Sequence, residues 1–205
     1  MRIYRHFRQA KAKAIAFVLG LVALAVSVLA SPVGADVWGS QSSTTGAHPD
    51  GSTHNYCWGS GFDTNLRDNV DEMFDDALGG PTDATVEFKS TCKFSGSGET
   101  DVVWFDADLP GSTRGTAPCE DYDNGYCDQY YVTLDPAQIN VGSNDDADTD
   151  KTVCHELGHT VGLTHGSGGG DGGTDDCMIS GERPSTNSQY ERYSSHHKEH
   201  INAWF

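Results

Sequence analysis

The thirteen residues from 153 to 165, Val-Cys-His-Glu-Leu-Gly-His-Thr-Val-Gly-Leu-Thr-His, constrain the fold of this chain more than any other stretch. On an α-helix, His155 and His159 would lie one turn apart and about 40° from each other around the axis, so both imidazoles would face one metal ion. A continuing helix would carry His165 to the far side. Gly162 can adopt a positive φ, end the helix and turn the chain back, which would deliver His165 as a third ligand.

The residue types in this stretch predict a catalytic zinc. Three histidine ligands leave one coordination position open, which is typical of catalytic rather than structural zinc sites. Glu156 lies one step around the helix and is free to hold a water rather than the metal. We therefore expect Zn²⁺ at His155, His159 and His165, with Glu156 as the catalytic residue.

The extended pattern His-Glu-x-x-His-x-x-Gly-x-x-His, followed by Met178 in the sequence Asp-Cys-Met-Ile-Ser, resembles the metzincin clan of zinc endopeptidases. This resemblance implies that zinc polarises a scissile carbonyl while Glu156, as general base, moves a water proton to the leaving amine. It also implies a structural Met-turn at Met178, packed under the imidazoles. Ser180 replaces the Tyr with which astacins and serralysins reach the metal, so we expect no tyrosine assistance.

The order of the predicted elements resembles the N-terminal subdomain of matrixin-like metzincins, from about Thr53 to Gly166. The resemblance implies a mixed α/β (α+β) zincin fold, with a mostly parallel twisted sheet, an amphipathic helix and the zinc-site helix. A small C-terminal subdomain ending in a helix would follow. The metzincin-like catalytic domain is assigned to residues 56–205, and its substrate is expected to be an extended polypeptide that pairs with the edge of the cleft.

Local patterns supply the elements of this fold. Apolar residues at helical spacing predict an amphipathic helix over 64–78, which Gly79-Gly80-Pro81 would end. Alternating or β-branched runs predict strands over 85–89, 101–106 and 129–134, and residues 114–117 are a candidate for the edge strand. Ser194 or Ser195 could cap a final helix, along which Ile201, Trp204 and Phe205 recur at i, i+3 and i+4.

The N-terminus predicts export. Five Arg and Lys residues within the first fourteen precede 16 apolar and small residues, a run shorter than the roughly 20 that a membrane span prefers. Val33-Gly34-Ala35 offers a cleavage site, so residues 1–35 are interpreted as a signal peptide and the protein as secreted and extracellular. An uncleaved anchor is the weaker alternative. Residues 36–55, rich in Ser, Thr and Gly, are expected to be a flexible lead-in or short pro-segment, with His48 and His54 exposed in it.

Charge limits the partners of the mature protein. Loss of the five leader cations would leave 8 Lys and Arg residues against 30 Asp and Glu residues, a formal charge of −22. Nucleic acid and anionic membranes would repel such a domain. We therefore expect no nucleic acid, no membrane after signal cleavage, and a monomer by default.

The six cysteines all follow the leader, and an even number in an exported chain predicts three disulfides. The metzincin resemblance, in which the Met-turn lies beneath the zinc histidines, implies a Cys154–Cys177 bridge between the zinc helix and Met178. Cys119 and Cys127 bracket a short loop rich in Asp, Asn and Gly and are expected to pair. Cys57–Cys92 then follows by elimination.

Acidic residues cluster at 145–150, just before the expected zinc helix. Negative charge at a helix start complements the macrodipole, so this run already has a structural explanation. Ca²⁺ is left open as a second metal, because oxygen ligands are abundant but no EF-hand pattern is present.

The expected function is that of a secreted zinc metalloendopeptidase, a hydrolase of peptide bonds. One alternative is a peptidase of narrow specificity that ignores general substrates. Another is a non-catalytic extracellular binding module on a zincin fold, against which the intact Glu156 argues. An acidic calcium-binding structural protein is a further class, and its melting would depend on calcium but not on zinc.

Overall fold

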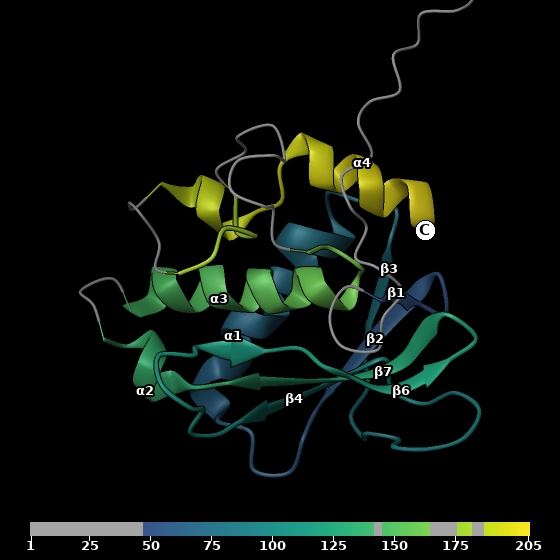
Figure 1. The fold of residues 1–205 in the computed structure, drawn as a ribbon, viewed down its shortest axis with the longest axis horizontal. Coiled ribbons are helices and arrows are strands. Elements are labelled where there is room, and N and C mark those ends of the chain that lie inside the picture. Colours follow the sequence, from purple (N-terminus) through teal and green to yellow (C-terminus); the bar gives the residue numbers. More distant parts are fainter. Residues whose placement is uncertain (1–46, 142–144, 165–175, 182–186) are drawn as a thin grey trace, which may run out of the picture. The chain divides into compact units, whose positions relative to one another are not determined.

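The structure is a computed structural model that describes residues 47–141, 145–164, 176–181 and 187–205. Its centre is a seven-stranded sheet with the strand path β1-β7-β4-β2-β3, to which β5 and β6 add through β7 (Figure 1). The strands are β1 His48–Pro49, β2 Thr53–Trp58, β3 Thr85–Phe88, β4 Val102–Asp106, β5 Gly115–Thr116, β6 Cys119–Asp123 and β7 Tyr126–Leu134.

The sheet is mixed and mostly parallel, as the sequence predicted. The pairs β1–β7, β4–β7, β2–β4 and β2–β3 are parallel, whereas β5 and β6 run antiparallel to β7. Leu134 of β7 pairs with Asp106 of β4 and with Gly115 of β5. Since a strand has only two sides, β5 lies on the side of β7 away from β4. Among the described strands β5 pairs with β7 alone, so it forms an edge.

The helices are α1 Thr64–Met73, α2 Pro136–Ile139, α3 Asp145–Thr160 and α4 Ser195–Trp204, with a π-helical segment η1 Phe74–Gly79 and a 3₁₀ segment η2 Ser188–Glu191. The predicted helix over 64–78 is present as α1 and its continuation η1. Asp63 caps its start by accepting from the Asn65 amide at 2.9 Å. None of the described helices is long and apolar enough to cross a membrane.

The acidic run does not precede α3 as expected but forms its first turns. Asp145, Asp146 and Asp148 occupy the first turn, where their charge complements the unpaired amides of the helix start. The Thr149 hydroxyl donates to the Asp145 carbonyl at 2.8 Å, which satisfies its hydroxyl within the helix.

The assignment of residues 36–55 to a flexible lead-in is wrong for its second half, since β1 and the start of β2 lie there. His54 is fully buried and His48 is 9% exposed, so neither is an exposed loop histidine. The signal for β2 was the β-favouring segment at Tyr56-Cys57-Trp58, which the preceding Gly- and Ser-rich residues obscured. Residues 1–46, including the predicted signal peptide, lie outside the described residues.

One hydrophobic core joins the sheet to the helices. Trp104, Val132 and Leu134 from the strands pack in the same cluster as Phe74 from η1 and Leu157 from α3. The chain ends in a helix as predicted, and Ser194 caps α4 by accepting from the His197 amide. Ile201 of α4 belongs to this same cluster, so the C-terminal segment shares the core rather than forming a subdomain with a core of its own.

All three predicted disulfide pairings are present in the structure. Cys57–Cys92 and Cys119–Cys127 have Cα–Cα distances of 5.4 and 5.8 Å, and Cys154–Cys177 also measures 5.8 Å. The Cys119–Cys127 bridge joins β6 to β7 across a hairpin turn at Asn124-Gly125, where both residues have positive φ. An Asn-Gly pair favours this two-residue turn, which brings the two cysteines together.

Candidate active site

His155 and His159 lie side by side on α3. Their ring centroids are 4.8 Å apart with the planes at 87°, and the side chains are buried. His155 Nδ1 lies 2.8 Å from the Cys177 carbonyl and His159 Nδ1 lies 2.8 Å from the Leu163 carbonyl. A carbonyl only accepts, so each Nδ1 donates its hydrogen and each Nε2 presents a lone pair. Neutral imidazoles held in this way fit a zinc ion.

The helix ends at Gly162, as its sequence position predicts. Gly162 has a φ of 90°, and its amide donates to the His159 carbonyl at 3.2 Å. The Leu163 amide reaches back to the Gly158 carbonyl at 2.9 Å, which completes a Schellman motif with Gly162 at C′. The same turn holds the Leu163 carbonyl against His159. The third predicted ligand, His165, lies outside the described residues, and within these no group of three His, Cys, Asp or Glu is placed to bind a metal.

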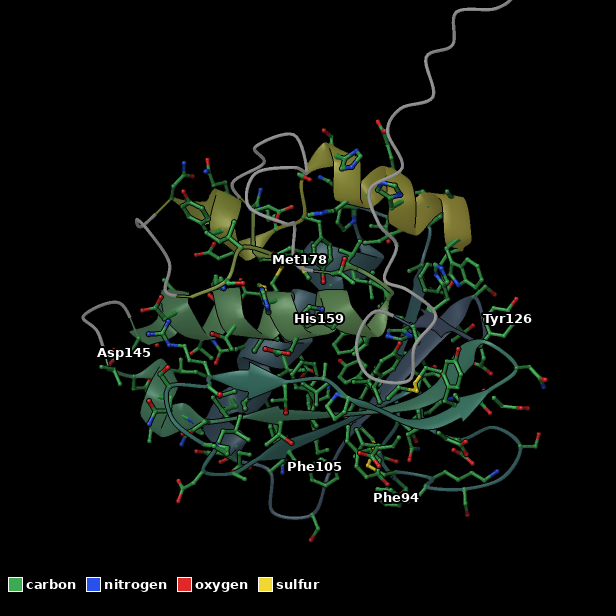
Figure 2. The ribbon with its side chains drawn as sticks, viewed as in Figure 1. Phe94, Phe105, Tyr126, Asp145, His159 and Met178 are labelled. Atoms are coloured by element: carbon green, nitrogen blue, oxygen red, sulfur yellow. A yellow bond between two sulfur atoms is a disulfide. The ribbon has the colours of Figure 1, made fainter. Side chains whose placement is uncertain are left out.

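Met178 packs against α3 at Gly158 (Figure 2). It is 2% exposed, and a Cβ added to Gly158 would lie 2.3 Å from its sulfur. The close approach of the Met178 sulfur to α3 therefore requires glycine at position 158. The helix surface at Gly158 is thus covered by a thioether, which is polarisable and adaptable in shape.

Several bonds fix the Met178 segment to α3. Besides the Cys154–Cys177 disulfide, the buried Tyr193 hydroxyl donates to the Cys154 carbonyl at 2.9 Å. Asp176 accepts from the amides of Met178 and Ser194 at 2.9 and 2.8 Å, and it pairs with His197 of α4. Burial alone would raise the pKa of Asp176, but the bond and charge of His197 and the two amides hold it below its usual value. Asp176 is therefore an ionised link between the Met178 segment and α4.

Glu156 lies between the two histidines in sequence and is 5% exposed. Burial raises its pKa to about 8, while the charge of Lys151 opposes that rise. A Cβ on Gly115 of β5 would lie 2.6 Å from the Glu156 side chain. The absence of a side chain at Gly115 therefore leaves the room that the carboxylate occupies under the edge strand.

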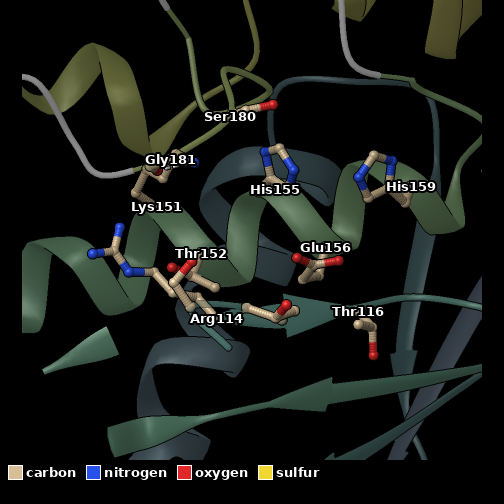
Figure 3. Close-up of a pocket in the computed structure, with 12 residues that line it drawn as sticks. Arg114, Thr116, Lys151, Thr152, His155, Glu156, His159, Ser180 and Gly181 are labelled. Carbon is tan, nitrogen blue, oxygen red and sulfur yellow. Dashed lines mark hydrogen bonds between the residues drawn. The ribbon is translucent and has the colours of Figure 1, made fainter. Parts of the chain in front are cut away.

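A pocket of about 460 Å³ opens between β5 and α3 (Figure 3). The side chains of both histidines and of Glu156 line it. Its walls come from the segment leading into β5, from α3 and from the residues after Met178, and its lining residues are Ser112, Thr113, Arg114, Gly115, Thr116, Lys151, Thr152, His155, Glu156, His159, Ser180 and Gly181. Residues 114–116 of the predicted edge segment 114–117 thus form a wall of the pocket, whereas Ala117 does not line it.

Sequence reasoning missed two contributors to this region. Lys151 is 4% exposed and donates to the carbonyls of Ile179 and Gly181 at 2.6 and 2.9 Å. His54 of β2 lies 2.8 Å from the Thr160 hydroxyl at the end of α3. Lys151 closes the acidic run, and no local signal distinguished it from a solvated charge. His54 reaches α3 only through the packing of the sheet against the helix.

The chain was compared with protein families, curated proteins and solved structures. The chain matches no protein-family model and no curated protein. Among solved structures it is similar to the crystal structure of archaemetzincin from Methanopyrus kandleri, with 17% sequence identity and a TM-score of 0.46, covering 76% of this chain and 97% of that one.

Proposed function

We propose that this chain is a secreted, zinc-dependent endopeptidase of the metzincin type. The observation that carries the proposal is the pair of buried imidazoles on one face of α3, each held by a backbone carbonyl, with Glu156 beside them in an open pocket. His165 is proposed as the third ligand and residues 1–35 as the signal for export. The geometry also agrees with the metzincin resemblance at Gly162 and Met178.

A zinc ion bound at these histidines would supply Lewis-acid chemistry, which activates water and polarises a peptide carbonyl. The chain supplies the proton transfers. Glu156, which lines the pocket with both histidines, can accept a proton at its carboxylate and release it to the leaving amine. The carbonyls of Cys177 and Leu163 hold the two imidazoles in the required tautomer throughout.

Strand β5 offers the surface on which a polypeptide would bind. It is an edge among the described strands and it borders the pocket that contains Glu156. An extended segment could pair with the exposed backbone of this edge, which gives affinity with little dependence on sequence. The substrate is therefore proposed to be an extended or unfolded polypeptide.

The direct test is hydrolysis of casein by the purified secreted protein. Activity is expected in the wild type, loss with a chelator, and recovery on adding zinc. Glu156→Gln should keep one bound zinc, measured by metal analysis, and lose hydrolysis. Glu120→Gln, an exposed carboxylate on β6, is the matched control and should remain active. Full casein hydrolysis by Glu156→Gln would refute the assignment, and cleavage of library peptides but not of casein would indicate a narrow-specificity peptidase.

A further inference from the structure

The pocket beside Glu156 has the opposite charge character from the rest of the protein. Only 8 Lys and Arg residues follow the predicted leader, against 30 acidic residues, yet two of those cations, Arg114 and Lys151, line this one pocket. They come from separate elements, the segment entering β5 and the middle of α3. Their convergence is therefore a product of the tertiary fold.

Lys151 is placed to donate into the pocket. Its ammonium has three hydrogens, of which the carbonyls of Ile179 and Gly181 take two. Gly181 itself lines the pocket, so these bonds hold the nitrogen at the wall. The residue is only 4% exposed, and the described residues supply no third acceptor to its ammonium. A buried ammonium with a remaining donor favours an anionic acceptor.

Arg114 is held at the same side of the pocket. Its Nε donates to the Gln138 carbonyl at 3.1 Å, which positions the guanidinium. In Figure 3 Arg114, Lys151 and Thr152 lie toward the left of the view, with Lys151 next to Gly181 and the Arg114 guanidinium pointing away from Glu156. A guanidinium with a fixed orientation suits a carboxylate, because its planar donors match the two oxygens.

The other residues that line the pocket favour the binding of a polar group. Apart from the two cations, Glu156 and the histidines, the pocket is lined by Ser, Thr and Gly, and no described lining residue is aliphatic or an aromatic hydrocarbon. Ser180 adds a hydroxyl group that can donate to an anion, whereas the Thr152 hydroxyl donates to the Asp148 carbonyl.

We infer that this pocket binds the carboxylate of an Asp or Glu side chain next to the scissile bond of the substrate. The inference rests on the proposed peptidase function and specifies its substrate class. Lys151 lies one helical turn from His155, a rise of about 6 Å. An extended chain advances about 3.3 Å per residue, so the pocket suits a side chain that flanks the reacting carbonyl rather than a distant one.

The test uses pairs of peptides with blocked ends that differ only by Glu or Gln at one residue flanking the cleaved bond. For the wild type, kcat/KM should be roughly 10- to 100-fold higher for the Glu peptide at one of the two flanking positions, as expected for a charged hydrogen-bonded pair. Arg114→Gln should bring this ratio close to one. Arg114→Glu should reverse it in favour of a Lys peptide.

Lys151→Met tests the buried cation, with its fold checked by circular dichroism because the side chain also ties α3 to the Met178 segment. The matched control is Lys198→Gln, a cation on α4 that does not line the pocket, and it should keep the wild-type ratio. Equal hydrolysis of the Glu and Gln peptides by the wild type would overturn the inference while leaving the peptidase function intact.

A binding measurement separates this inference from the proposed function. Fluorescence anisotropy of the labelled peptides with Glu156→Gln protein should show roughly 10-fold tighter binding of the Glu peptide, and Arg114→Gln should remove the difference. If no peptide is cleaved but this preference is present, the peptidase assignment fails and the carboxylate pocket stands. Equal binding of both peptides would overturn the pocket assignment.

Discussion

His54 should make the stability of this domain depend on pH below neutrality. The side chain is fully buried, and burial lowers its pKa from 6.5 to about 3. The Thr160 hydroxyl donates to the Leu157 carbonyl, so His54 Nε2 donates to Thr160. His54 Nδ1 has no hydrogen-bond partner among the described atoms. A proton there would be a buried, unpaired charge near the ring of Phe74.

The direction and size of this stability change follow from the pKa of His54 in the unfolded chain and in the folded protein. The folded state binds this proton more weakly than the unfolded chain does, so the full stability is present above pH 6.5 and falls as the pH drops toward 3. Each pH unit in that window costs about 1.4 kcal/mol. At pH 5 the loss from His54 alone should therefore be about 2 kcal/mol, a large part of the stability of a typical domain.

The perturbation is His54→Gln, whose amide nitrogen can keep the bond to Thr160 but does not titrate. The free energy of unfolding is measured by urea denaturation from pH 7.5 to 4.5, with disulfides intact and with chelator present so that zinc binding does not contribute. All other titrating groups are shared, so the difference between the two profiles isolates His54. Between pH 7 and 5 the wild type should lose about 2 kcal/mol more than His54→Gln. Parallel profiles would refute the reasoning.

Three further substitutions test the contacts that hold the residues of the candidate active site in place. Replacing Cys154 and Cys177 together by Ser should lower the free energy of unfolding by about 3 kcal/mol and weaken zinc binding, and unchanged zinc affinity would contradict the proposed role of this disulfide. Tyr193→Phe should cost about 1 kcal/mol in urea denaturation, because it removes a buried hydrogen bond to a carbonyl of α3; an unchanged midpoint would count against that bond. Gly115→Ala would bring a methyl group within 2.6 Å of Glu156, so kcat should fall by roughly 10-fold or more while metal analysis still finds zinc; wild-type kcat would show that the carboxylate has other room.

The sequence by itself determined the features that depend on local periodicity and local chemistry. Four-residue spacing places His155 and His159 on one helical face whatever the surroundings, and Gly162 ends that helix because it can adopt a positive φ. The strands at 85–89, 101–106 and 129–134 were also readable from β-branched and aromatic runs, although β7 begins three residues earlier than predicted because Tyr126 pairs with Asp123 across the hairpin.

Only the tertiary structure decided which distant side chains surround the site. Nothing near His54 in the sequence shows that β2 will carry it to Thr160, and the Ser- and Gly-rich context suggested a loop instead. Arg114 and Lys151 are 37 positions apart, and nothing in their local sequence joins them, but the antiparallel pairing of β5 with β7 brings the first against the pocket that α3 lines. Burial and charge convergence are set by packing between elements far apart in the chain, so local spacing cannot encode them.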